Sequence, residues 1–319
     1  MNSPANAESQ SNAICFVIVF NHKYEQNIPK LRAIYGDKFT NIAFLMPFGD
    51  ALQDGVVPVY DSSYRFEGYF AQGYQHLASD KYSHYVFVGD DLILHPRLNQ
   101  NNLIAELGLD DQSGYIKTLT PLSQAHFDWP HMLATMEALA LFGQDGYVNA
   151  QPELPSSQDA FQILRGKGHQ FNPLTWRHWR DPNRKYHSSL RQRWRSFRWL
   201  ARHAGRHGYI LPFPLLQGYS DFVVVPAAHA RQFCRLCGVF SALNLFAEIA
   251  IPTALALSCP HVVTEQDVSW HGVELWDRDA LERLLQHNNY DLSQMLRSYA
   301  DDQLYLHPLK LSKLQGFST

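Results

Sequence analysis

Two adjacent carboxylates, Asp90 and Asp91, are the first candidates for a metal-binding or catalytic role, and they follow the strand-forming run 85–89. A strand buried on both faces carries apolar side chains, and an unpaired charge there is costly. We therefore expect the chain to leave the sheet at Gly89 and to place both acids at its carboxyl edge, where open α/β sheets bind ligands. Two oxygen ligands suit Mg²⁺ or Mn²⁺ carrying a diphosphate. The alternative is that the pair only opens a turn or caps a helix.

Three later residues could complete such a site. His271, in the sequence Trp270-His271-Gly272, could add an imidazole to a shell that carboxylates begin, although it is one of 16 histidines and could be an ordinary one. Glu248 is the one acid of an apolar helical stretch, where burial would raise its pKa and suit a general base. A structural, ion-paired glutamate is the alternative. Asp221, directly before a strand, is the second candidate for acceptor chemistry.

The first hundred residues predict the elements that would position these groups. Apolar runs predict strands at 14–20, 41–46, 56–60 and 84–88, with a short helix at 27–35. Phe66, Phe70, Tyr74 and Leu77 recur at helical spacing and predict a helix over 65–78. This alternation is typical of an α/β fold with a mostly parallel, Rossmann-type sheet flanked by helices.

The remainder of the chain predicts more helices than strands. Helices are expected at 131–141, 157–164, 228–237, 244–257, 277–286 and 291–300, strands at 222–225 and 261–264, and a loop at 269–274. The predicted organisation is a disordered leader (1–13), a nucleotide-sugar-binding half (14–98), an insertion or acceptor region (99–210), an acceptor-binding and catalytic half (211–300) and a loose tail (301–319).

Segment 176–207 differs from the rest in composition. It contains ten of the 27 Lys and Arg residues, one of the 30 acids and four of the seven tryptophans. The rest of the chain therefore has 17 basic and 29 acidic residues, a net charge of −12. The segment predicts a basic helical insertion. It could bind nucleic-acid backbone, an anionic membrane surface or an anionic acceptor, or lie as a solvated arm on the acidic body. Because no nucleic-acid module signature accompanies it, nucleic acid is the least favoured partner.

Composition narrows the class of protein. The 319 residues are 45% hydrophobic, which is ample for a large core. The sequence shows neither a secretory signal nor an apolar stretch of about 20 residues, so we expect a cytoplasmic protein. The four cysteines are expected to be free core thiols, since the lone pair Cys234 and Cys237 lacks the second pair of a zinc ribbon.

The chain resembles glycosyltransferases of the GT-A type. Gly89-Asp90-Asp91 after a strand is similar to that superfamily's DxD metal motif in its xDD form, with Gly89 in place of the first acid. The first strand ending in Phe20-Asn21, the late acid in Phe246-Ala247-Glu248 and the late His271 add to the resemblance. It covers roughly 14–98 and 211–275, and no family pattern matches 99–210.

The resemblance implies roles for these residues. Asp91 and His271, supported by Asp90, would hold Mn²⁺ or Mg²⁺. Glu248 would be the base of an inverting enzyme or would stabilise the reacting centre of a retaining one, with Asp221 as the second candidate. The nucleotide contacts would come from Phe20, Asn21, Asp61, Arg65 and Asp90.

The implied function is transfer of a sugar from a UDP- or GDP-sugar to a glycan or lipid-linked acceptor, in surface polysaccharide or glycolipid synthesis. Such an enzyme would lie in the cytoplasm or peripherally on the inner face of the membrane. The main alternative is a non-catalytic protein that binds anionic membrane or nucleic acid through segment 176–207. A nucleotidyltransferase would need a second acid pair near the first, which the sequence does not show.

Overall fold

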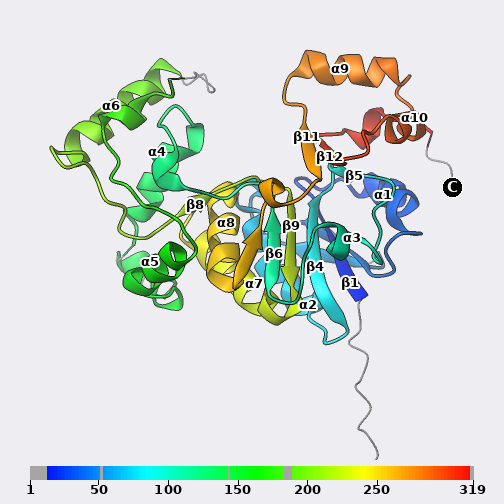
Figure 1. Ribbon diagram of the computed structural model, residues 1–319, viewed down its shortest axis with the longest axis horizontal. Coiled ribbons are helices and arrows are strands. Elements are labelled where there is room, and N and C mark those ends of the chain that lie inside the picture. Colours follow the sequence, from blue (N-terminus) through cyan, green and yellow to red (C-terminus); the bar gives the residue numbers. More distant parts are fainter. Residues whose placement is uncertain (1–12, 51–52, 143, 148, 183–188, 317–319) are drawn as a thin grey trace, which may run out of the picture.

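The computed structural model describes residues 13–50, 53–142, 144–147, 149–182 and 189–316. Strands and helices follow one another along most of the chain (Figure 1). The strands are β1 Ala13–Val19, β2 Ile42–Pro47, β3 Val56–Val59, β4 Tyr82–Gly89, β5 Ile93–Leu94, β6 Ser113–Ile116, β7 Thr120–Pro121, β8 Leu216–Gln217, β9 Phe222–Pro226, β10 His261–Val263, β11 His271–Glu274 and β12 Gln303–His307. The helices are α1 Ile28–Tyr35, α2 Glu67–Leu77, α3 Leu103–Glu106, α4 Pro130–Leu139, α5 Ser157–Gly166, α6 Leu190–His203, α7 Ala227–Ala242, α8 Ala247–Ser258, α9 Arg278–His287 and α10 Leu292–Arg297.

A seven-stranded sheet in the order β10-β6-β9-β4-β1-β2-β3 forms the centre of the molecule. Only β9 runs antiparallel to its neighbours β4 and β6, so the sheet is mostly parallel. The run β3-β2-β1-β4 has the strand order of a nucleotide-binding half of a doubly wound fold. The predicted α/β class with helices flanking a mostly parallel sheet is confirmed.

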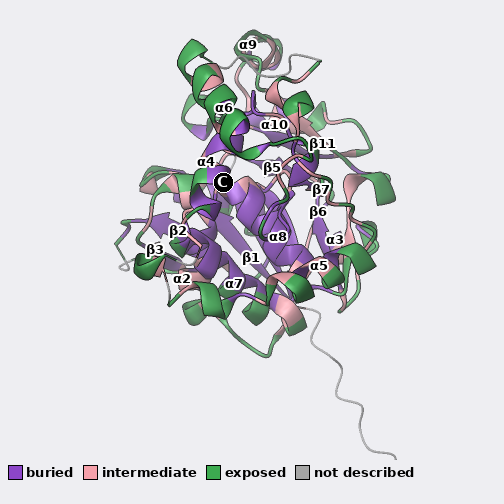
Figure 2. Ribbon diagram, turned by 90° about the vertical axis from the view of Figure 1, so that its left-hand side faces the viewer, coloured by how far each residue is buried: buried purple, intermediate pink, exposed green. Residues whose placement is uncertain are grey.

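Both faces of this sheet are buried, which explains the continuous apolar runs in the sequence. In β1, Cys15 and Val17 face a core shared with α2, α7 and α8, whereas Phe16 and Ile18 face a second core shared with α1, β5 and β12. Central strands and α8 are buried, while α6 and α9 lie exposed at the periphery (Figure 2). All four cysteines are buried and free, as expected of core thiols.

A three-stranded sheet in the order β11-β12-β5 lies beside the end of β4 (Figure 1). Two predictions fail here. Segment 269–274 was expected to be a loop but contains β11, and the tail expected to be loose contains β12, whose Leu304 and Tyr305 are fully buried. A strand of four or five residues gains its stability from its partners. These partners are distant in sequence, so local patterns gave little sign of either strand.

Most other predicted elements are present with shifted ends. The predicted helix at 228–237 extends to Ala242, and the predicted helix at 291–300 ends at Arg297. The basic insertion contains α6, as predicted, but 183–188 lie outside the described residues. Ala13 already belongs to β1, and the rest of the predicted leader is not described. Within the described residues, no helix has both the length and the apolar character needed to cross a membrane. The domain boundaries stay a prediction.

Candidate functional site

The strand β4 ends where the sequence predicted. Gly89 N–H donates to the Asp221 carbonyl at 2.9 Å and Asp90 N–H donates to the Val19 carbonyl at 3.0 Å, so β4 stays paired on both sides up to this point. Leu92 N–H then closes a turn on the Gly89 carbonyl at 3.1 Å. Asp90 and Asp91 occupy this turn at the carboxyl edge of the sheet.

A histidine from the end of the chain meets Asp91. His307 Nε2 lies 3.1 Å from Asp91 Oδ1. The cause is strand register: β12 pairs antiparallel with β5, with Tyr305 opposite Leu94 and Leu306 opposite Ile93. Continuing that register places residue 307 beside the turn, and Leu309 N–H donates to the Asp91 carbonyl at 2.6 Å. The tertiary pairing therefore fixes the contact between His307 and Asp91.

Tyr219 links this histidine to a second carboxylate. Its hydroxyl lies 2.6 Å from His307 Nδ1 and is hydrogen-bonded to Asp221. A metal-binding histidine commonly donates its other ring N–H to an oxygen, which fixes the ring's orientation and tautomer. With Nδ1–H donating to the Tyr219 oxygen, the Tyr219 hydroxyl donates to Asp221. Nε2–H of the protonated ring donates to Asp91 Oδ1, and a bound ion would take the place of this proton.

Burial and mutual repulsion raise the pKa values of Asp90 and Asp221 at this edge. Burial, with repulsion from Asp91 as the second cause, raises the pKa of Asp90 to about 7. Burial raises the pKa of Asp221 to about 6, although the nearby His307 lowers it. Burial alone would lower the pKa of His307, but its hydrogen bond to Asp91 and the charge of Asp221 raise the pKa above its usual value. Acids crowded in this way form an environment that favours a cation.

A cluster of largely buried polar side chains packs against β12, the strand that carries His307. Lys117 Nζ lies 2.7 and 2.5 Å from the two carboxylate oxygens of Glu274 and 3.4 Å from Glu265. Tyr305 donates to the same Glu274 at 2.6 Å, and its ring stacks on that of Tyr219 at 5.9 Å. Because Lys117 and Glu274 are both largely buried, these contacts hold β11 and β12 in place behind the site.

The donor set fits a hard divalent cation. Ligands at right angles around an ion at about 2.1 Å lie about 3 Å apart, which matches the Asp91–His307 separation. A Cβ added at Gly89 would lie 3.4 Å from Asp91 Oδ1 and 3.7 Å from Asp221 Oδ1, so the glycine leaves open the space between these two carboxylates. Within the described residues, no group of three or more His, Cys, Asp or Glu side chains converges tightly enough to enclose an ion. Magnesium-type ions are often held by one or two carboxylates completed by substrate phosphates.

His271 lies elsewhere. It begins β11 opposite Gln303, four residues before His307, or about 13 Å along the strand. It is exposed, and its ring lies 3.9 Å from Glu265. The structure thus brings His307 to Asp91 and leaves His271 at the far end of the small sheet.

The two residues that follow β1, Phe20 and Asn21, have different surroundings. Phe20 is fully buried and packs edge-on against Phe44. Asn21 N–H lies 3.4 Å from Asp90 Oδ1, and Asn27 also bonds Asp90. Asp90 is therefore directed toward the end of β1. Asn21 shares a small hollow with Gly89 and Asp221.

Asp61 and Arg65 are bound to each other. Their ion pair is 2.8 Å long, and Asp61 also accepts from Ser241 at 2.8 Å. Arg65 additionally bonds Asn244. These contacts join the turn after β3 to the end of α7, and both side chains remain partly exposed.

Glu248 stands in the first turn of α8 and is half-buried. Its backbone carbonyl accepts from Gly218 N–H at 3.0 Å, so α8 and the Tyr219 segment are held together. An aromatic group precedes it: Phe246 stacks on His131 at 3.6 Å and lies 4.7 Å from Tyr64. Burial lowers the pKa of His131 to about 4, so this ring is neutral.

Sequence reasoning missed His307, Tyr219, Glu274 and Lys117. The sequence carries one sign of the strand β12. Its apolar run 304–306 ends in His307-Pro308, just as the apolar run of β5 is followed by His95-Pro96. Both are strands that stop at a proline, which cannot donate to a ladder.

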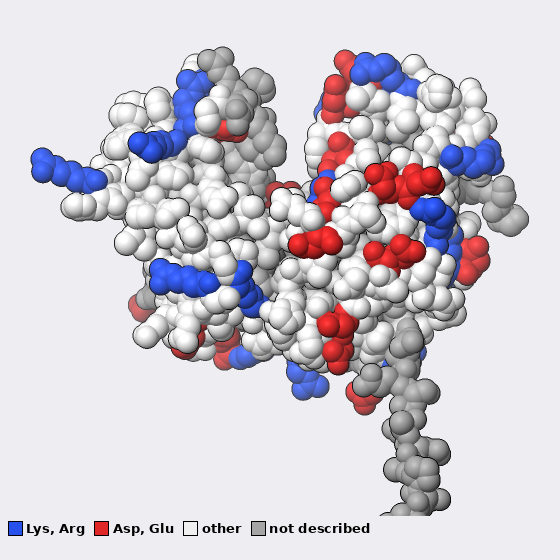
Figure 3. Space-filling view, in the orientation of Figure 1, with Lys and Arg blue, Asp and Glu red and all other residues white. Residues whose placement is uncertain are grey.

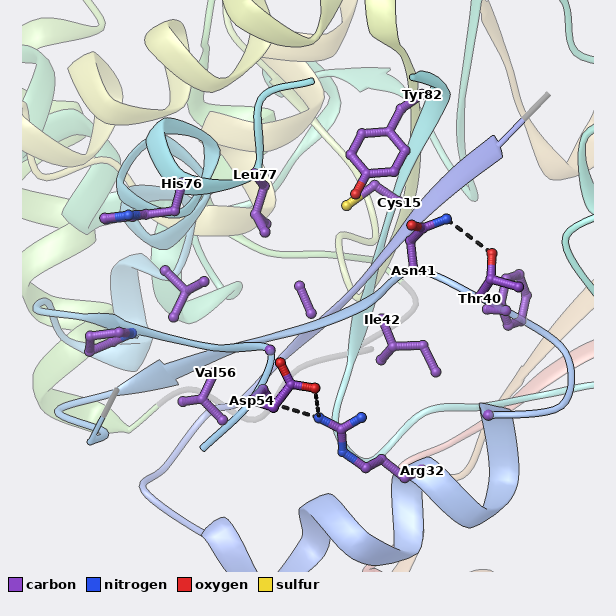
Figure 4. Close-up of a pocket in the computed structure, with 16 residues that line it drawn as sticks. Cys15, Arg32, Thr40, Asn41, Ile42, Asp54, Val56, His76, Leu77 and Tyr82 are labelled. Atoms are coloured by element: carbon purple, nitrogen blue, oxygen red, sulfur yellow. Dashed lines mark hydrogen bonds and ion pairs between the residues drawn. The ribbon is translucent and has the colours of Figure 1, made fainter. Parts of the chain in front are cut away.

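A larger hollow of about 660 Å³ lies at the opposite edge of the sheet, at the amino ends of β1, β2 and β3 (Figure 4). Its cation, Arg32, is already bonded to the Asp54 carbonyl at 2.5 Å. Open α/β sheets bind ligands at the other edge. There, the molecular surface is hollowed between two lobes, with acidic groups at the floor and on the right-hand lobe (Figure 3).

Sequence comparison finds no protein family and no curated protein that matches this chain. Among solved structures, the chain is similar to core-mannan synthase A (CmsA/Ktr4) from Aspergillus fumigatus, crystallised in an Mn/GDP form. The identity is 11%, the match covers 84% of this chain and 75% of the synthase, and the TM-score is 0.33. A likeness of this size establishes neither activity nor ligands, and the fold rests on the sheet topology described above.

Proposed function

We propose that this protein is a metal-dependent glycosyltransferase that moves a sugar from a UDP- or GDP-sugar to a glycan or lipid-linked acceptor. The contact of Asp91 with His307 at the carboxyl end of β4, beside Asp221, carries the proposal. It combines an oxygen and a nitrogen ligand at the spacing of one coordination shell, at the edge where such sheets bind nucleotides.

Asp91 and His307 would hold Mn²⁺ or Mg²⁺ together with the donor diphosphate. The ion, when bound, neutralises the diphosphate that leaves. Tyr219 orients the His307 ring, and Lys117 and Glu274 keep β12 in position behind it. Asp90 fixes the end of β1 through Asn21, so that this segment can meet the nucleotide.

Glu248 is the proposed acceptor base, or the group that stabilises the reacting centre if the enzyme retains configuration. It begins α8 beside the Tyr219 segment and remains half-exposed, so an acceptor hydroxyl can reach it. Asp221 lies nearer the proposed ion, between Tyr219 and Gly89.

Titration calorimetry with UDP and GDP, each with and without Mn²⁺, tests the site directly. We expect binding that requires both ion and nucleotide, and at least a tenfold loss in Asp91→Ala and His307→Ala. His271→Ala is the matched control and should bind as the wild type does. Equal losses for His271→Ala and His307→Ala would contradict the assigned ligand.

Activity is measured as Mn²⁺-dependent release of nucleotide from a panel of UDP- and GDP-sugars. Glu248→Gln should keep nucleotide binding and lose turnover, because it removes a proton acceptor and leaves the ion ligands in place. Metal-independent nucleotide binding with no turnover of any donor would support a non-catalytic protein.

A further inference from the structure

Two stripes of side chains run next to each other along the outside of α6. Residues four, three and four positions apart lie on one face of a helix. The apolar stripe is Leu190, Trp194, Phe197 and Ala201, and the basic stripe, one residue further on at the same spacing, is Arg191, Arg195, Arg198 and Arg202. All eight residues are exposed.

The apolar stripe is accessible although α6 is attached to the body. Ser196, Leu200 and Ala204 form the buried side of the helix and its end. On the outside, Leu190 is 82% exposed and Trp194 is 61% exposed. Trp194 stacks on Phe197 at 5.7 Å, and Trp176 lies 5.4 Å from the same ring. This exposed apolar cluster has no obvious function in an isolated molecule.

The basic stripe is largely unneutralised within the described part of the chain. Arg195 pairs with Glu137 of α4 at 2.5 Å, whereas no described residue forms an ion pair with Arg191, Arg198 or Arg202. Arg191 and Arg195 also line a hollow of about 350 Å³ between α4 and α6. Basic groups appear on this left-hand lobe, opposite the acid-rich lobe (Figure 3).

We propose that the two stripes of α6 form a docking surface for an anionic membrane, with the helix lying in the plane of the lipid headgroups. The apolar stripe would enter the boundary between headgroups and acyl chains, with Trp194 at the depth that tryptophan prefers. The arginine stripe would contact lipid phosphates, each side chain adding to the attraction. The inference does not depend on the proposed transfer reaction.

The apolar stripe favours a membrane over nucleic acid. A single-stranded nucleic acid binds through phosphate contacts and bases stacked on aromatic rings. Leu190, the most exposed large apolar residue on α6, offers no ring for stacking and would remain in water. A lipid surface satisfies Leu190, both rings and the arginines at once.

Flotation of the full chain with vesicles tests the charge component. We compare phosphatidylcholine vesicles with phosphatidylcholine–phosphatidylglycerol vesicles at low and high salt. Binding is expected only to the anionic vesicles and should weaken with salt. The variant R191Q/R198Q/R202Q should bind roughly a hundredfold more weakly. The control R231Q/R278Q/R283Q removes the same charge from exposed positions of α7 and α9 and should bind as the wild type does.

A second variant, W194S/F197S, tests the apolar component. It should lose most binding to anionic vesicles while circular dichroism keeps the helical signal, because neither side chain belongs to the buried side of α6. The control is Ile163→Ser, an exposed apolar position on α5. Equal binding to neutral and anionic vesicles, equal weakening by both triple variants, or displacement of the protein from vesicles by an oligonucleotide of equal charge would overturn the proposal.

Discussion

Asp91 and His307 lie 216 positions apart in the sequence and 3.1 Å apart in the fold. Their meeting shows how a short motif acquires its meaning from one distant residue. Asp90, equally prominent in the sequence, faces Asn21 and Asn27 and is almost fully buried. The two neighbouring acids therefore face different partners: Asp91 faces His307, and Asp90 faces the end of β1.

Glu67 gives a residue-scale prediction outside the site. It is fully buried at the start of α2, neither of its carboxyl oxygens has a hydrogen-bond partner among the other described residues, and burial raises its pKa well above 4.5. The unfolded chain therefore releases this proton at lower pH than the folded chain does. This contribution to stability is complete below about pH 4.5 and is lost as pH rises toward the folded pKa, by at most about 1.4 kcal/mol per pH unit.

The Glu67→Gln variant removes this titration. Urea unfolding between pH 5 and pH 8 should show its stability increasing relative to wild type as pH rises. Asp37→Asn, at an exposed position, is the control and should keep the wild-type pH dependence. A constant difference between Glu67→Gln and wild type across this range would show that Glu67 is ionised in the folded state.

The decisive element is β12. It pairs with β11 on one side and with β5 on the other, so it connects the end of the chain to the turn that carries Asp91. The pairing leaves no room between strands: a Cβ at Gly272 would lie 2.2 Å from the buried ring of Tyr305. The Tyr305 hydroxyl donates to Glu274, and the ring stacks on Tyr219, which contacts His307.

Gly272→Ala should therefore displace Tyr305 and weaken Mn²⁺-dependent nucleotide binding as well as stability. We expect a loss of about 1–3 kcal/mol in unfolding free energy, the cost of overpacking a core. Gly166→Ala is the matched control: its Cβ would meet no described atom within 4 Å at the end of α5, and alanine favours a helix. Wild-type melting and nucleotide affinity for Gly272→Ala would disprove the role of this close contact.

At the scale of the molecule, the open hollow at the carboxyl edge separates two unlike surfaces. Acidic groups lie at its floor and on one lobe, and the basic helix α6 belongs to the other (Figure 3). The proposed membrane surface and the proposed ion site thus occupy different parts of one chain. They can be inactivated separately, which makes each testable without the other.

Ligand-induced stabilisation tests the molecule as a whole. If ion and nucleotide bind only the folded state, their presence at a hundredfold above the dissociation constant should add about 2.7 kcal/mol of stability. A thermal-shift series should show a rise in melting temperature with Mn²⁺ and GDP or UDP together that exceeds the effect of either alone. The rise should disappear in Asp91→Ala and persist in the R191Q/R198Q/R202Q variant.

Features of the fold that depend on neighbouring residues could be predicted from the amino-acid sequence. The apolar run of β1, the helical spacing in α2 and the break at Gly89 are properties of neighbouring residues, and burial of the sheet on both faces explains them. The cost of burying two charges in a strand predicts the turn that carries Asp90 and Asp91, although Asp90 is buried in this turn with its pKa raised to about 7. The basic, aromatic composition of α6 was equally visible.

The residues that meet Asp91 could not be predicted in this way, because they are brought together by long-range strand pairing. The choice of His307 over His271 depends on the register of β12 against β5, and a short strand obtains its register from a partner some 200 residues away. The orientation of Asp90 and the mutual pairing of Asp61 with Arg65 likewise depend on contacts between distant elements. Local patterns specify which segments become strands, while long-range hydrogen bonding and packing specify which side chains those strands bring together.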